Sequence, residues 1–160
     1  MANHIWLAFA DGQYLFHLKN KRIAEVEAKC KAGLGDIYAR TMTGVYLDTE
    51  GQWTVIPQEA KWFNSELVEV VRQGIIGGGK GIVDGTDVIV TEWRANELIN
   101  HYLDEQPRIE LWRIAVPILH ATFEGYEEPK KEEPPMEGAS SQHETSDTTA
   151  SSEATATLDT

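Results

Sequence analysis

Residues 4–18, HIWLAFADGQYLFHL, form two short alternating runs on either side of the dipeptide Asp11-Gly12. Asp-Gly is a strong hairpin signal, because both central positions of the favoured two-residue turn need positive φ. Apolar residues occupy both odd and even positions, so both faces of the predicted hairpin are apolar. A lone hairpin is marginally stable in water. The rest of the chain must therefore supply elements that cover it.

Helical periodicity follows the hairpin and predicts a bundle of four to five helices. The expected helices are one capped by Asn20 and ended by Gly33, a short one after Gly35, one between Pro57 and Gly77, one capped by Thr91, and one from Pro107 to Gly125 that Pro117 should kink. The stretch 45–57 reads as extended structure or a long loop. Residues 80–90 read as a loop with at most a short strand at 88–90. The predicted fold class is α+β: an N-terminal β-hairpin followed by four to five helices.

The composition changes abruptly after Tyr126. From Glu127 onward the chain holds nine acidic residues and two lysines, which give −7 of the total charge of −12, and it holds no aromatic residue, Val or Ile. Such a segment cannot bury enough apolar area to offset its conformational entropy. The sequence therefore predicts a folded domain at 1–126 and a disordered acidic tail at 127–160.

The acidic balance argues against a nucleic-acid partner, because phosphate binding needs clustered Lys and Arg. No apolar run approaches the length of a membrane span, and no secretory signal opens the chain. One cysteine, Cys30, excludes an internal disulfide and follows a helical stretch, which favours a core position over a nucleophile. We expect a protein of the cytoplasm, bound neither to membrane nor to nucleic acid.

The run Arg72 to Gly81, RQGIIGGGKG, comes within one residue of the phosphate-binding pattern G-x-x-x-x-G-K-[ST]. Gly81 follows Lys80 and lacks the hydroxyl that holds Mg²⁺, and the element before Gly74 has the period of a helix. The sequence after Lys80 does not begin a helix, and the next acidic residue beyond an apolar run, Glu92, comes too soon for a crossover unit. We expect Gly77 to supply the left-handed residue past a helix end, with its neighbours in a mobile surface loop. Nucleotide binding by residues 74–80 remains a remote alternative.

No other pattern indicates catalysis, a metal or a cofactor. The five histidines, at 4, 17, 101, 120 and 143, lack the spacing of metal ligands, and the Glu25/Glu27 and Glu66/Glu69 pairs read as solvated helix faces. We therefore expect a protein that is not an enzyme and that binds no cofactor.

Five tryptophans, at 6, 53, 62, 93 and 112, are many for a folded part of this size. Core packing explains most of them. Trp62 and Trp93 flank the glycine-rich segment, where an exposed tryptophan would serve as an interaction anchor.

The order of motifs resembles one protein family. A hairpin FADGxYxFxL precedes a helix with IAEVEA, and then come GLGDIYAR, VVRQGIIGGG and WRIAVPILHATFEG. In this order the chain resembles the small tail proteins of gene transfer agents and related phages, which are treated as tail-assembly chaperones and sometimes labelled tail tube proteins. The run at Arg72 to Gly79 is the most specific element. The segments 44–62 and 80–90 look like departures from the compact family pattern.

The resemblance implies a non-catalytic chaperone that binds the tape measure protein, the tail tube protein or both in the host cytoplasm, and that is absent from the mature virion. Self-association is also expected. The alternative is a structural tail tube or minor tail protein. The residues expected to bind a partner are Trp62, Arg72, Ile75, Ile76, Gly77, Gly78, Gly79 and Trp93. The paired codons of Lys130 and Lys131 suggest a frameshift site for a longer product.

Overall fold

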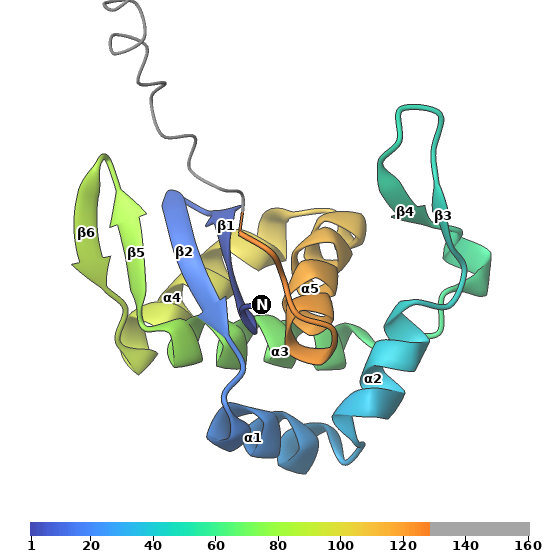
Figure 1. Cartoon of the computed structure of the whole chain (residues 1–160), viewed down its shortest axis with the longest axis horizontal. Helices are drawn as coiled ribbons and strands as arrows, with labels where there is room; N and C mark the ends of the chain where they lie inside the picture. The colour runs from blue at the N-terminus through green and yellow to red at the C-terminus, as the bar shows by residue number, and fades with distance from the viewer. Residues whose placement is uncertain (129–160) are drawn as a thin grey trace, which may run out of the picture. The chain divides into compact units, whose positions relative to one another are not determined.

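The computed structural model describes residues 1–128, so the predicted tail and the Lys130-Lys131 junction lie almost wholly outside the described residues. The described part confirms the α+β class, with an N-terminal hairpin and five α-helices. In Figure 1 four of the strands, β1, β2, β5 and β6, form one layer, and the helices α3, α4 and α5 lie against it.

The main sheet is antiparallel and has the order β1-β2-β5-β6. Its strands are β1 (His4–Phe9), β2 (Gly12–His17), β5 (Lys80–Val83) and β6 (Thr86–Ile89). The first hairpin pairs His4 with His17 and Phe9 with Gly12, and β5 then joins the free side of β2. A second hairpin, absent from the sequence-based expectation, thus completes the sheet.

Helices cover one face of this sheet. The α-helices are α1 (Asn20–Cys30), α2 (Leu34–Thr41), α3 (Asn64–Gly78), α4 (Glu92–Tyr102) and α5 (Arg108–Phe123). Helix α3 is central, since it packs against β2, α1, α4 and α5. The predicted kink at Pro117, which does lie inside α5, stays a prediction.

Alternation along the first hairpin explains where the core lies. Ile5 and Phe9 of β1, with Tyr14 and Phe16 of β2, are buried and point toward the helices. They meet the apolar side of α3, including the fully buried Leu67, and the buried α5 residue Trp112. The opposite face of the sheet is left without a covering layer (Figure 1).

Within residues 45–57, expected to be extended or a loop, β3 (Val45–Leu47) and β4 (Trp53–Val55) form a separate hairpin. We call residues 45–55 the arm, because they project from the body beside α2 (Figure 1). A short 3₁₀ turn at Pro57–Glu59 leads from the arm toward α3.

The two turns of the main sheet correct the sequence-based expectation. The first turn centres on Ala10 and Asp11, of which Ala10 has positive φ, and Gly12 already belongs to β2. A Cβ at Gly12 would lie 2.3 Å from the Ile82 carbonyl oxygen. Glycine is therefore needed at this position so that β5 can pack closely against β2, and not for the conformation of the turn. The expected loop at 80–90 is the hairpin β5–β6, turned by Asp84 and Gly85, both at positive φ.

Candidate interaction surface

The glycine run is half-buried and packed against strand β2. Helix α3 continues through Gly78, and Gly79, not Gly77, is the left-handed residue past its end, with φ 69°. A Cβ at Gly77 would lie 1.9 Å from the His17 carbonyl oxygen, and one at Gly78 1.8 Å from that of Leu15. The expectation of a mobile surface loop is therefore wrong: glycine lets the end of α3 lie directly on β2.

The neighbouring predicted residues do not form an exposed patch. Ile75 is fully buried and Ile76 is partly buried against the core. Arg72 donates from its guanidinium to Glu69 and is largely covered. A role for residues 72–79 in binding a partner stays a prediction, but their visible contacts are with this chain.

Buried carboxylates lie beneath these residues, where α1, α2 and α3 meet. Glu66 accepts two hydrogen bonds from Arg40, and Glu69 accepts one from Gln73 at 2.8 Å. Burial raises the pKa of the nearby Cys30 thiol, and the two carboxylates raise it further. The Glu66/Glu69 pair is therefore an internal ion-pair network, not the solvated helix face expected from the sequence.

The two candidate anchor tryptophans differ in exposure. Trp62 is partly buried and lines a pocket of about 250 Å³ with Val55 and Ile109. Trp93, in the first turn of α4, is 72% exposed. Only Trp93 thus has the exposure expected of an anchor, and it follows β6 closely in the chain.

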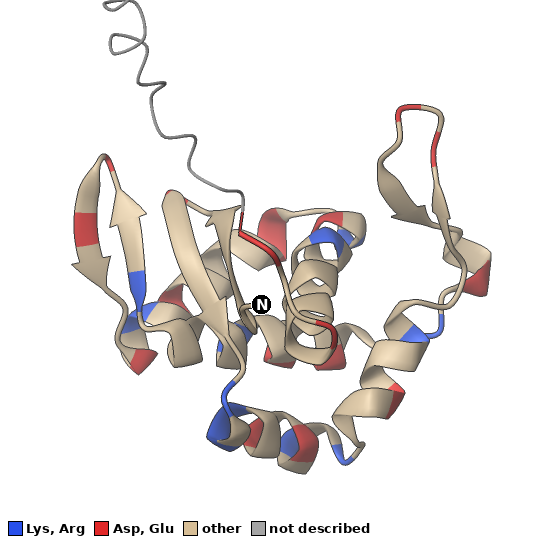
Figure 2. Cartoon of the chain, viewed as in Figure 1, with Lys and Arg blue, Asp and Glu red and all other residues tan. Residues whose placement is uncertain are grey.

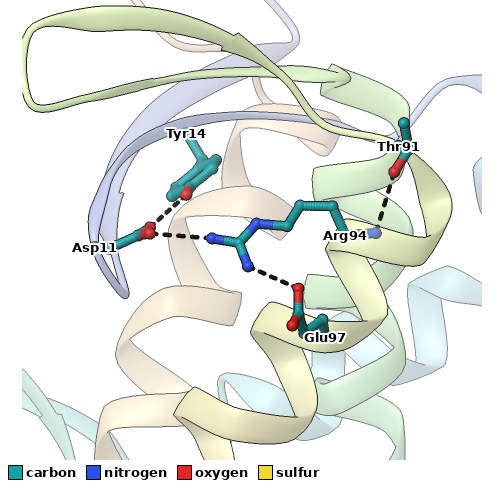
Figure 3. Close-up of polar contacts among 5 residues, drawn as sticks. All are labelled: Asp11, Tyr14, Thr91, Arg94 and Glu97. Carbon is teal, nitrogen blue, oxygen red and sulfur yellow. Dashed lines mark hydrogen bonds and ion pairs between the residues drawn. The ribbon is translucent and has the colours of Figure 1, made fainter.

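The first turn of α4 is fixed to the first hairpin by a polar cluster (Figure 3). Arg94 donates to Asp11 at 3.1 Å and to Glu97 at 2.8 Å, while the Thr91 hydroxyl caps the helix by accepting from the Arg94 backbone N–H. Tyr14 donates its hydroxyl proton to Asp11, and burial together with this bond raises the pKa of Tyr14 to about 12. The cluster therefore positions α4, and Trp93 with it, relative to the sheet.

The uncovered face of the sheet carries a row of three apolar residues and one lysine. The register places Trp6 opposite Leu15 and Lys80 opposite Ile89, and the Lys80 ammonium lies 5.9 Å from the Trp6 ring centroid. This outer row (Trp6, Leu15, Lys80 and Ile89) runs from one edge strand to the other. Figure 2 shows β1 and β2 free of charged residues, so the charge of this face lies on β5 and β6.

The arm is the second exposed apolar feature. Leu47 and Trp53 are each 54% exposed, and Tyr46 is also exposed. Between the arm and α5 lies a pocket of about 440 Å³, lined by Val45 and Trp53 on one side and by α5 residues such as Val116 on the other. Exposed aromatic and aliphatic side chains beside an apolar pocket are typical of protein contact surfaces.

The sequence-based prediction missed Trp6, Leu47 and Ile89. The signal for Ile89 was present in the alternation of IVDGTDVIV around Asp84-Gly85, the dipeptide that marks a type I′ hairpin. The signal for Leu47 lay in the alternation around the Glu50-Gly51 turn. The exposure of these side chains depends on which face of the sheet the helices cover. The periodicity of the sequence does not specify that face.

The described residues hold no group of three His, Cys, Asp or Glu side chains placed to bind a metal ion. No helix within residues 1–128 is long and apolar enough to cross a membrane.

Residues 2–125 match a protein family described as "Phage tail tube protein, GTA-gp10". No curated protein and no solved structure matches the chain.

Proposed function

Because the chain belongs to the phage tail tube protein family GTA-gp10, we propose that it is a non-catalytic structural subunit of the tail tube of a phage or gene transfer agent. The match over residues 2–125 carries this proposal, since it spans nearly the whole described part. The match shows that the chain belongs to a family of phage tail proteins. Its specific function, as a subunit of the tube, is what we propose.

The exposed surfaces support a subunit that works by contact. A tube repeats one subunit many times, so each copy must offer apolar surfaces to its neighbours. The outer row and the arm lie on separate elements and provide two such surfaces. The polar side chains around Arg94 bond to one another, and those around Glu69 do the same in a separate cluster. Such internal bonding suits structural roles better than catalysis.

A second function, assembly chaperone, is favoured by the pocket beside the arm. Its apolar walls and its volume of about 440 Å³ suit an apolar side chain or helical stripe of another tail protein, such as the tape measure protein. A chaperone would use this pocket during assembly in the host cytoplasm and leave before the tail is complete.

Quantitative mass spectrometry of purified particles tests the proposal and separates the two functions. A tube subunit is expected in many copies per particle, comparable with the other major tail proteins. A chain that is required for tail formation yet missing from finished particles would contradict the tube function and favour the chaperone.

A further inference from the structure

We propose that the pocket of about 440 Å³ beside the arm binds a basic side chain, a lysine or an arginine, of a different tail protein. The proposal rests on the function proposed above, contact with other tail proteins, and names the chemistry that this contact uses at the pocket. The course of α5, the aromatic walls of the pocket and one carboxylate carry the inference.

The wall that α5 contributes changes from apolar to polar along the pocket. Trp112, Val116, His120 and Glu124 all line the pocket and follow one another at intervals of four residues, so they share one face of α5 and of the turn that ends it. From Val116 to Glu124 the helix axis advances by about 12 Å, at about 1.5 Å per residue. A ligand that fills the pocket therefore needs a long apolar part and a polar end.

The polar end presents a carboxylate that is open to a partner. Glu124 accepts a hydrogen bond from the Tyr38 hydroxyl at 2.9 Å and lies 2.8 Å from Nδ1 of His120, in both cases through Oε2. Within residues 1–128 its other oxygen, Oε1, receives no hydrogen bond, and its ion-pair partner is a histidine, which is charged only when protonated. Because the Glu124 side chain is 58% exposed, a cation from outside can reach Oε1.

Aromatic side chains line the same pocket from three parts of the chain. Tyr38 comes from α2, Trp53 from the arm and Tyr126 from the segment after α5. Aromatic rings attract ammonium and guanidinium groups, and clusters of such rings recognise organic cations. Among the described residues, the cations that lie over aromatic rings are Arg40 and Lys80, and both do so outside this pocket, which leaves its rings for a cation of a partner.

Tyr38 is fixed in place before a partner arrives. Its ring stacks on Phe123, with the ring centroids 4.8 Å apart, while its hydroxyl donates to Glu124. Burial and this hydrogen bond raise the pKa of Tyr38 to about 12, so the hydroxyl remains a neutral donor. An aromatic ring and a carboxylate held together in this way lower the entropy cost of binding a cation.

Lysine and arginine are the side chains that combine both required parts. Each has an apolar stem of about three or four methylenes that packs on apolar surface, and each ends in a cation. The stem suits the apolar wall formed by Val45 and Val116, and the cation suits the end formed by Tyr38 and Glu124. A purely apolar side chain would leave the carboxylate end of the pocket without a partner.

The charge of the chain indicates that the basic side chain belongs to a different protein. The chain carries a net charge of −12, and the lining of the pocket, drawn from the described residues, includes no Lys or Arg. A second copy of so acidic a chain is repelled, whereas a basic surface is attracted and steered toward the pocket.

Titration of the full-length chain with two small probes tests the proposal. N-acetyl-lysine methylamide and N-acetyl-norleucine methylamide share a four-carbon stem, and the lysine probe adds the ammonium group. Binding is followed by the methyl NMR signals of Val45 and Val116, at pH 8, above the titration range of histidine. We expect the lysine probe to bind at least about tenfold more tightly than the norleucine probe, because the rings and Glu124 attract its ammonium group.

Three variants assign the preference to the pocket. Glu124→Gln keeps the size of the side chain and should reduce the preference for lysine to about twofold or less, with norleucine binding unchanged. Glu127→Gln is the matched control, since it removes the same charge from an exposed residue outside the lining and should retain the preference. Trp53→Leu keeps an apolar wall without the ring and should weaken lysine binding more than norleucine binding. Circular dichroism and thermal unfolding identify the variants that remain folded.

Equal affinity for the two probes, no change of the Val45 and Val116 signals with either, or a lysine preference that survives Glu124→Gln would overturn the proposal. These outcomes are separate from the tube function, which particle copy number decides. Abundant copies in the particle together with equal affinity for the two probes would retain the tube function and reject a basic partner at this pocket.

Discussion

Gly77 and Gly78 have a packing function that no larger residue can take over. Their α-carbons face the carbonyl oxygens of β2, and a Cβ there would overlap the backbone of His17 or Leu15. Helix α3 can lie this close to the sheet only because these positions lack a side chain. The same glycines made the segment look like a phosphate-binding loop in the sequence.

We expect Gly78→Ala to lower the free energy of unfolding by about 3 kcal/mol or more, because the backbone of α3 and β2 must separate to admit the methyl group. Gly35→Ala is the matched control: a Cβ at Gly35 meets nothing within 4 Å in the first turn of α2, so this change should be neutral or slightly stabilising. Urea denaturation of both variants measures the difference. Equal stabilities would show that α3 does not depend on this close approach.

Arg40 neutralises the buried carboxylate of Glu66, whose side chain is 5% exposed. Arg40→Met should destabilise the fold by about 2–3 kcal/mol, since a buried charge would lose its partner while water still reaches the half-open Arg40 position. Adding Glu66→Gln should restore most of the loss, and denaturant unfolding of the single and double variants checks this. A double variant as unstable as Arg40→Met alone would mean that packing, not charge, explains the effect.

His17 should give the fold a pH dependence. Burial lowers the pKa of His17 below its ordinary value of 6.5, and the nearby His4 and Lys19 lower it further. The unfolded chain then binds a proton that the folded chain resists, so stability contributed by neutral His17 is present above pH 6.5 and falls as the pH drops toward the folded pKa. Urea unfolding of the wild type and His17→Gln on either side of this pH should show a smaller decrease for the variant. Parallel pH curves would contradict this assignment.

At the scale of elements, the arm is separable from the stability of the body. Leu47 and Tyr46 are exposed and face away from the main core. The double change Tyr46→Ser and Leu47→Ser should alter the free energy of unfolding by less than about 1 kcal/mol, as is usual for exposed positions. The same change should reduce incorporation of the chain into particles, measured by immunoblot against a capsid protein. Normal incorporation would show that the arm does not contact another tail protein.

The first hairpin and the start of α4 were predictable from the sequence, because short local patterns specify both. Alternation in HIWLAF and QYLFH predicted the first hairpin, and Thr91 was correctly placed as the cap of α4, since its hydroxyl accepts from the Arg94 N–H. The cap at Asn20 was wrong: Asn20 is the first helical residue, after Lys19, and no side chain caps α1. Capping needs a particular backbone geometry as well as a suitable side chain.

The second hairpin was missed for a tertiary reason. Residues 80–90 contain two glycines, Gly81 and Gly85, which lower strand propensity, and the chain forms strands there because the free edge of β2 accepts β5. Gly81 lies directly against the Tyr14 ring, where a side chain would not fit. Glycine lowers the local strand propensity of β5, but the packing of Tyr14 requires it. The exposed candidate site could not be located without this pairing, because Ile89 belongs to it.

At the scale of the whole molecule, membership of the tail tube family and the open sheet point to the same conclusion. Helices protect one face of the sheet, and the other face is left for contact. The arm adds an exposed apolar surface on a separate element. A protein with these surfaces is suited to act as one of many copies in an assembly.

Cryo-electron microscopy of the finished tail tests the tube function most directly. We predict a tail wall whose repeating unit fits residues 1–128, with the four-stranded sheet backed by α3, α4 and α5. A wall built from another protein, with no density that fits this unit along the tail, would contradict the proposal.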